Sequence, residues 1–559
     1  MISAMKGPPA GTACRRGARG REMVTQEHLQ DLELLAAMIR RRRHAQLIAS
    51  PGRFEAMHAC EGDLLLDLSS AAMTPEVISA LLSFAAACGL GERRSAWIDG
   101  ETAADPSLEA IPAPALRCPP GQVSEVDGQD ISRALDASRQ WPETLAMAIR
   151  RGEIGGAGGR PFTDILQLGP ETADPGPAMV TRSLTAAGGA APRVHFLSSK
   201  EGNRLRRLTA RLDPGTTAIV FAEREILAPE IRMLASRLRG WLIAHLGEAA
   251  ARRQLFAVTR DVETARALGM DPARIMGFTN RSHASFSCWS PLNLGLQIAI
   301  GPDALLDLRR GAHQMDMHFR DAPSAINLGT LLGLADFWHE DMLGLAQADP
   351  MQFGAGPDDW AAYMRGLRSR RGASSSPGRA RVADLLVSAL PEDVDWDEYQ
   401  VSAMAEGLHS LRQRSHGGRQ RRPGGPVLIE PRRGASLPEP GQPTVILAYG
   451  RFDAVTLGRL MALSEHRLFV TASLRGRSFR SEPRRVPEEV ARLGRVFSTG
   501  SMTGTDPVLH GLVAHLVQLR GLTPEAGPHT GRAAEVITFP GFSGRRRRSG
   551  AQQLPHRTG

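Results

Sequence analysis

The chain has 559 residues, of which 42% are hydrophobic and 23% charged, so it can bury at least two cores and has the composition of an ordinary globular protein. No apolar run reaches the length of a membrane span, and the N-terminus lacks the apolar segment of a secretory signal, so we expect a cytoplasmic protein without membrane contact. The net charge of +9 gathers largely in arginine runs at 40–43, 419–422 and 545–548, which favours solvated loops and tails over a nucleic-acid partner. The five cysteines form no CxxC pair, which disfavours zinc and disulfides, and we expect neither a metal nor a cofactor.

The N-terminal part of the chain reads as a basic tail followed by a helical arm. Residues 1–24 are rich in Gly and Arg and are predicted to be disordered, while 25–43 has the pattern of an amphipathic helix. Residues 76–88 predict a second helix, with Thr74 as its N-cap and Pro75 at its first position. The arm is assigned to 25–110, and the Pro-rich, non-periodic stretch 101–121 is interpreted as a linker.

Strands and helices alternate after the arm. Short apolar strands are predicted at 165–168, 194–197, 217–221 and 255–259, with helices such as 230–246 between them. This order indicates a parallel sheet that helices cover on both faces. Residues 287–300 are apolar on nearly every side and predict a buried helix. We assign 111–301 to a first, smaller α/β domain.

The second half of the chain predicts another, larger α/β domain at 302–535. Helices are expected at 304–318 and 327–343, and a strand at 445–448. Residues 456–470 read as a helix that runs into a short strand at 468–470. The basic residues 536–559 are predicted to form a disordered tail.

Four segments resemble glucose-6-phosphate isomerases, and they occur in the order of that family. They read GDLLLDLSSAAMTPEVISALL at 62–82, SFSCWSPLNLGLQIAIG at 285–301, GAHQMDMHF at 311–319 and TLGRLMALSEHRLFV at 456–470. The resemblance covers roughly residues 45–530. It implies an α/β fold of two nested parallel-sheet, sugar-isomerase-type (SIS-like) subdomains with flanking helices, a homodimer, and the interconversion of glucose 6-phosphate and fructose 6-phosphate in glycolysis and gluconeogenesis. We interpret His313, Asp316 and His466 within these segments as architecture.

The motifs that hold the sugar phosphate in this family are altered here. The Gly-rich loop maps to 168–181, where Gly169 is retained but Glu171-Thr172-Ala173 occupies the centre, so Gly169 and Thr172 are candidate substrate contacts. The phosphate loop maps to 223–231. There, the family's Ser and Thr hydroxyls are absent, Glu223 and Glu225 occupy positions that should face the phosphate, and Arg224 lies between them.

The catalytic positions are also changed. The Arg that would steady the enediolate maps to Ser285, and Glu398 is the best match to the catalytic base. The family's Lys becomes Arg495, which keeps the charge but does not readily release a proton. The stretch RRGASLPEP that follows Pro431 contains no His to open the sugar ring.

The resemblance therefore predicts a divergent homologue with weak or absent isomerase activity. Two alternatives to this prediction remain. The first is an active isomerase with a remodelled site that uses Glu398 and Arg495. The second is a sensor that binds a sugar phosphate without turnover.

Overall fold

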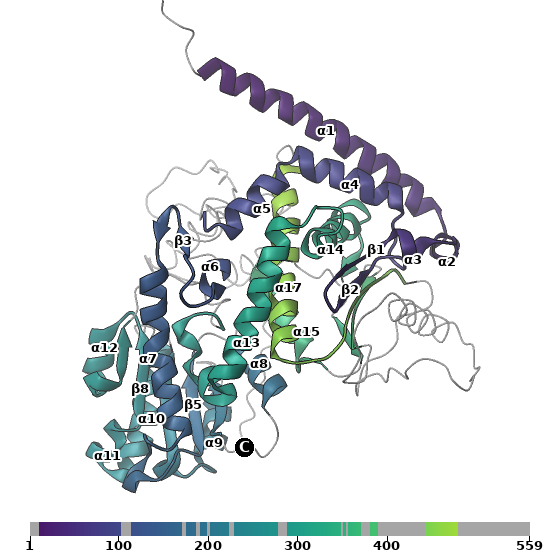
Figure 1. The fold of residues 1–559 in the computed structure, drawn as a ribbon. Coiled ribbons are helices and arrows are strands. Elements are labelled where there is room, and N and C mark those ends of the chain that lie inside the picture. The colour runs from purple at the N-terminus through teal and green to yellow at the C-terminus, as the bar shows by residue number, and fades with distance from the viewer. Residues whose placement is uncertain are drawn as a thin grey trace, which may run out of the picture. The chain divides into compact units, whose positions relative to one another are not determined.

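The computed structural model describes residues 11–101, 113–169, 175–185, 191–197, 202–222, 229–277, 288–347, 350–353, 356–370, 381–388 and 442–478. These residues lie within one compact unit, 1–478 (Figure 1). The predicted tail at 536–559 lies outside the described residues.

The N-terminal arm contains both helices and a hairpin. Its elements are α1 (Gly11–Arg41), α2 (His44–Ile48), α3 (Arg53–Ala56), β1 (His58–Glu61), β2 (Leu64–Asp67), α4 (Pro75–Ala87) and α5 (Leu90–Ile98). Helix α4 begins as predicted, because the Thr74 side chain accepts a hydrogen bond from the Val77 N–H. Helix α1, however, begins at Gly11, so the prediction of disorder is wrong for 11–24.

The predicted linker at 101–121 is wrong for residues 113–117. They form α6 (Ala113–Arg117), a short helix whose five residues are all buried. A small hairpin, β3 (Glu125–Val126) with β4 (Gln129–Asp130), and the long α7 (Ser132–Arg150) follow. The Pro-rich composition concealed α6 because proline is compatible with the first turn of a helix, where its missing N–H costs little.

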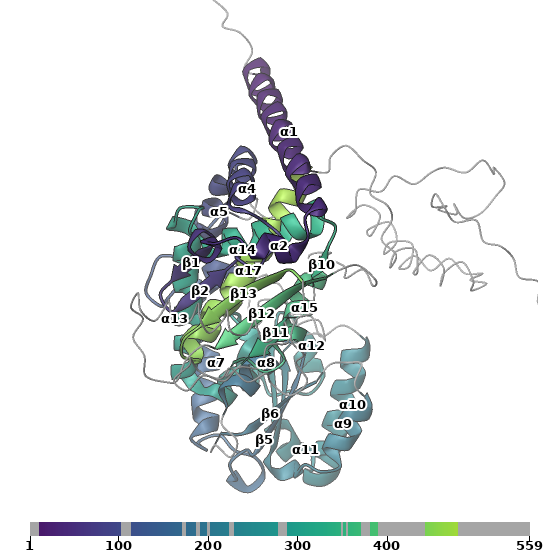
Figure 2. The ribbon, with the colours of Figure 1, turned by 90° about the vertical axis from the view of Figure 1, so that its right-hand side faces the viewer.

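The smaller sheet is entirely parallel, as predicted, with strand order β6-β5-β7-β8-β9. Its strands are β5 (Asp164–Leu168), β6 (Arg193–Leu197), β7 (Thr217–Ala222), β8 (Leu255–Thr259) and β9 (Ile275–Gly277). The helices between them are α8 (Gly176–Leu184), α9 (Gly202–Thr209), α10 (Pro229–Leu246), α11 (Glu248–Arg252) and α12 (Val262–Ala267), with 3₁₀ turns at Pro214–Thr216 and Pro272–Arg274. Side chains of α9, α10, α11 and α12 pack on one face, and α7 with the start of α13 (Leu294–Asp321) packs on the other. Figure 2 shows α9, α10 and α11 together on one side of this sheet.

The larger sheet has a parallel centre and an antiparallel edge. Strand β12 (Arg381–Ser388) pairs in parallel with β10 (Ala346–Gln347), β11 (Met351–Phe353) and β13 (Thr444–Tyr449). Strand β2 then joins β13 antiparallel and brings β1 with it. The arm predicted as helical therefore also supplies two strands to the sheet of the second half.

Two long helices, α13 and α17 (Ala454–Ser478), run side by side through the middle of the described fold (Figure 1). Glycines permit their close approach. A Cβ at Gly311 would lie 1.9 Å from the Val455 carbonyl oxygen, and a Cβ at Gly458 would lie 2.0 Å from that of Leu308. Helix α13 also crosses the predicted boundary at 301/302 and bends there, because Gly301 adopts φ 83° before Pro302.

The strand predicted at 468–470 is wrong, because α17 continues through it. Leu468, Phe469 and Val470 are buried, and the Phe469 ring stacks on Trp97 with centroids 4.6 Å apart. A helix buried on all sides loses its amphipathic period, so its apolar run looks like a strand in the sequence. The helix predicted at 327–343 forms α14 (Leu328–Phe337), continued by a π-helical turn at Trp338–Met342 and packed with α15 (Trp360–Arg370) around α17.

Within the described ranges, no single helix has the length and apolarity to cross a membrane; the bent pair α4 and α5 meets those two criteria only when taken together.

Candidate functional site

Three strands of the smaller sheet end at the same level. Leu168 at the end of β5 pairs with Leu197 of β6 on one side and with Phe221 of β7 on the other. Because the strands are parallel, the segments that follow them leave from one edge of the sheet. The predicted Gly-rich and phosphate loops, 170–174 and 223–228, are therefore anchored at neighbouring points.

Helices α8 and α10 begin directly after these two segments, at Gly176 and Pro229. The first turn of a helix carries a partial positive charge, which suits an anion. We expect the residues in the two segments to decide whether an anion is accepted there.

Gly169 forms the turn out of β5. Its φ is 75°, a conformation that favours glycine, and its N–H donates to the Leu197 carbonyl oxygen at 3.1 Å. The structure thus places this predicted residue at the edge, with its backbone tied to β6.

Gln167 is a residue at this edge that sequence analysis missed. It is fully buried; its Oε1 accepts from the Gly295 N–H at 2.7 Å, and its Nε2 donates to the carbonyl oxygens of Leu292 and Gly169 at 3.3 Å. A Cβ at Gly295 would lie 2.3 Å from that Oε1. One amide therefore fixes the turn after β5 to the start of α13. The available signal was an uncharged polar residue inside the short strand DILQL, whose only other polar residue is Asp164 at its start.

The other predicted site residues lie outside the described residues. They are Thr172, Glu223, Arg224, Glu225, Ser285, Glu398 and Arg495. The structure does describe the residues that precede these segments. The segment with Ser285 follows β9 and ends before Cys288, and the segment with Glu398 follows β12, whose last residue Ser388 pairs with Tyr449 of β13.

A buried cluster of charges anchors the chain immediately after the Ser285 segment. Arg117 of α6 donates through Nε (2.9 Å) and Nη2 (2.6 Å) to Asp316, and through Nη1 to Glu465 at 2.6 Å. Glu465 also accepts from the Trp289 indole N–H at 3.3 Å, and Asp316 accepts from His466 Nε2 at 2.8 Å. These contacts hold α6, α13, α17 and the turn that contains Trp289 together at one point. The interpretation of Asp316 and His466 as architecture agrees with these contacts.

In this cluster, burial and ion pairing shift the pKa values of the charged groups in opposite directions. Burial alone would lower the pKa of Arg117, but Asp316 and Glu465 raise it well above its ordinary value. Burial raises the pKa of Glu465, whereas the Arg117 charge holds the pKa of Asp316 below its usual range in spite of burial. Burial lowers the pKa of His466 to about 4, so its imidazole is neutral at pH 7. The cluster therefore depends on the single Arg117 cation.

A second buried arginine supports the larger sheet. Arg467 of α17 donates to both oxygens of Asp336 at 2.6 Å and to Asp384 of β12 at 2.7 Å. Arg368 also donates to Asp384, at 3.2 Å. These contacts fix β12, the strand that precedes the Glu398 segment. In the part of the chain that the structure describes, no group of three or more His, Cys, Asp and Glu side chains is placed to hold a metal ion.

Comparison with known proteins agrees with this architecture. The family model for phosphoglucose isomerase matches residues 67–379. The chain is 30% identical over 501 residues to glucose-6-phosphate isomerase of Xanthobacter autotrophicus, covering 81% of this chain and 91% of that protein. It is also 30% identical over 520 residues to the enzyme of Brucella anthropi, with 84% and 93% covered.

The fold comparison extends over nearly the whole relative. A crystal structure of glucose-6-phosphate isomerase from Chlamydia trachomatis matches with a TM-score of 0.59 at 14% identity, covering 88% of this chain and 99% of that one. With the parallel sheet, its glycine turn after β5 and the matching sequence segments, these findings show that the chain belongs to the phosphoglucose isomerase family.

Proposed function

We propose that this protein is a glucose-6-phosphate isomerase homologue that retains the scaffold but has weak or no isomerase activity. One observation carries the proposal. The pairing of Leu168 with Phe221 brings together the starts of two segments, and both carry carboxylates where the family has Gly, Ser and Thr.

The charge of these segments disfavours a phosphate dianion. Residues 170–174 include Glu171 and Asp174 and no basic residue, and residues 223–228 include Glu223 and Glu225 with only Arg224 to offset them. Repulsion between like charges at about 4 Å is roughly 4 kcal/mol at an effective dielectric of about 20, or about a thousandfold in affinity. The favourable helix N-termini supply only about 0.3–1 kcal/mol each.

The remaining family roles are also weakened in this sequence. Ser285 cannot supply the charge of the arginine that it replaces, and the ring-opening His has no counterpart. Glu398 and Arg495 are the residues that would carry any activity that remains.

Calorimetry with fructose 6-phosphate tests the charge argument. We expect the unmodified protein to bind weakly and the double variant Glu223→Ser/Glu225→Thr to bind more tightly by a few kcal/mol, because two carboxylates are replaced by hydroxyl donors. The matched control is Glu263→Ser/Asp271→Ser, which removes two carboxylates from α12 and the turn after it. This control should leave the affinity unchanged.

Two results would contradict the proposal. Tight binding of fructose 6-phosphate to the unmodified protein, with no gain in the double variant, would mean that 223–228 does not face the ligand. If fructose 6-phosphate bound tightly but was not converted, the protein would be a sugar-phosphate sensor rather than a homologue that binds the substrate weakly.

We also propose a cytoplasmic homodimer. The family relationship and the exposed apolar side chains Leu34 and Met38, one turn apart on α1 and 67% and 54% exposed, support self-association. Light scattering at micromolar concentration should report twice the chain mass of 60.3 kDa. A folded species with the mass of one chain would count against this assembly.

A further inference from the structure

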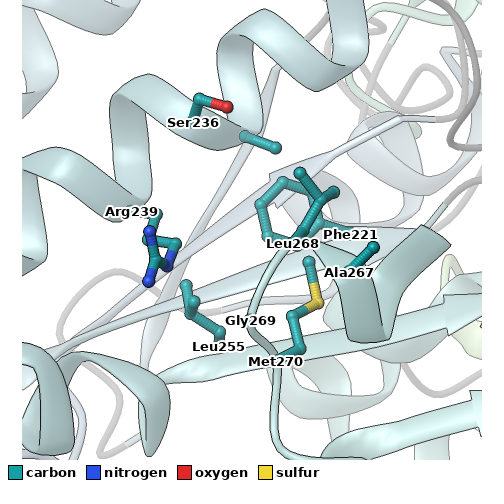
Figure 3. Close-up of a pocket in the computed structure, with 9 residues that line it drawn as sticks. Phe221, Ser236, Arg239, Leu255, Ala267, Leu268, Gly269 and Met270 are labelled. Carbon is teal, nitrogen blue, oxygen red and sulfur yellow. The ribbon is translucent and has the colours of Figure 1, made fainter. Parts of the chain in front are cut away.

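A cavity of about 230 Å³ lies under α10, between that helix and the turn that joins α12 to β9 (Figure 3). It is set on the face of the smaller sheet that α9, α10, α11 and α12 cover. Most of the residues that line it are apolar, and this apolar part is called its floor; two lining residues are polar. The floor includes Phe221, Leu255, Leu268 and Met270, and the polar groups are Ser236 and Arg239 on α10.

Arg239 is incompletely paired at this cavity. Its Nη2 donates to Glu248 of α11, but its Nε is buried and meets no acceptor among the described residues. The guanidinium lies against Gly269, where φ is 82° and a Cβ would lie 3.2 Å from Nε. A buried donor without an acceptor is unfavourable, so this geometry leaves an unused hydrogen-bonding capacity beside an apolar space.

Glu248 is a replaceable partner. It contacts one nitrogen of the Arg239 fork, and its side chain is 51% exposed. A carboxylate that approached from the cavity could take Nε and Nη2 together, which is the geometry that guanidinium prefers. For that contact Glu248 must release Nη2 and the guanidinium must turn from Gly269 toward the cavity.

We propose that this cavity binds a small monocarboxylate with an aromatic or branched apolar tail. The apolar floor accommodates the tail, and the Arg239 fork takes the carboxylate. A cavity of about 150 Å³ is enough for benzene, so the larger volume here holds a ring together with a carboxylate. A sugar phosphate fits poorly, because its hydroxyls would be buried against Phe221 and Leu255 without hydrogen-bond partners.

The test is calorimetry on the full-length protein with benzoate, and with benzyl alcohol as an uncharged probe of similar shape. Benzoate should bind saturably, and Arg239→Gln should weaken it about tenfold or more, since a charge-assisted hydrogen bond is lost. Arg239→Lys should give an intermediate affinity, because it keeps the charge without the fork. Glu248→Gln should tighten benzoate several-fold, because the competing carboxylate is gone.

The matched control is Arg237→Gln, which removes an exposed charge from the same helix without altering the cavity lining. It should leave benzoate binding unchanged, and all variants should keep the melting temperature of the unmodified protein. Equal affinity for benzyl alcohol and benzoate would overturn the proposal. So would an Arg237→Gln effect as large as that of Arg239→Gln, or the absence of saturable benzoate binding in Glu248→Gln.

Discussion

Purified protein is expected to convert glucose 6-phosphate to fructose 6-phosphate at least about 10⁴-fold more slowly than an active relative. Loss of one positioned acid–base group typically costs 10²- to 10⁴-fold, and under the proposed mapping the ring-opening His has no counterpart and the phosphate loop is acidic. The same mapping puts Ser285 at the position of the arginine for the enediolate. A coupled assay that follows fructose 6-phosphate measures this directly, with the Xanthobacter autotrophicus enzyme prepared in parallel as the reference.

The preparation must come from a host that lacks its own isomerase, because a trace of contaminating enzyme would dominate such a low rate. Glu398→Gln and Arg495→Met identify whether residual turnover belongs to this chain. If kcat/KM reaches about 10⁵ M⁻¹s⁻¹, in the ordinary enzyme range, and falls in these variants, the protein is an active isomerase with a remodelled site.

Replacement of Arg117 by methionine is expected to destabilise the protein by about 3–5 kcal/mol, the usual cost of removing one partner from a buried ion pair. Asp316 and Glu465 would both remain buried and would lose the cation that they share. Urea unfolding measures the loss as a lower midpoint. The control is Arg160→Met, whose ion pair with Asp213 joins side chains that are 54% and 50% exposed and should change stability by less than about 1 kcal/mol.

The loss should depend on pH with a defined sign. Without Arg117, burial raises the pKa of both carboxyls above their unfolded values, so the folded state is favoured when they are protonated and loses stability as pH rises through those pKa values. The loss of unfolding free energy caused by Arg117→Met should therefore be larger at pH 8 than at pH 5. A deficit below about 1 kcal/mol at pH 8 would show that water or other groups satisfy these carboxylates. Adding Asp316→Leu and Glu465→Leu should restore part of the stability, because no buried charge then remains unpaired.

Much of the fold could be predicted because its signals are local. The strands of the smaller sheet are short apolar runs separated by helical patterns, and the start of α4 carries a cap that lies within four consecutive residues, 74–77. The errors arose where tertiary packing overrides local pattern. The run at 468–470 is apolar because α17 is surrounded, and 113–117 looked like a linker although Arg117 is fully buried.

The candidate site was less accessible from the sequence. Gly169 was singled out because it is retained in the segment that resembles the family's Gly-rich loop, and its positive φ explains why this position favours glycine. The role of Gln167 is to join β5 to a turn 125 residues later, and the role of Arg117 is to pair with residues 199 and 348 positions away. Contacts of this kind leave no local pattern, and only the three-dimensional arrangement reveals them.

The crossing of α13 and α17 has a consequence for how this lineage can change. At Gly311 and Gly458 each helix meets the backbone of the other, so even one added methyl group must push two helices apart. The segments 170–174 and 223–228 differ in sequence from the family motifs to which they are mapped, and the chain still matches the fold of a glucose-6-phosphate isomerase. We therefore expect substitutions at Gly311 and Gly458 to be tolerated less well than substitutions in these segments. Such a protein can lose catalytic activity while it keeps its fold. The folded scaffold can then come to bind a different ligand.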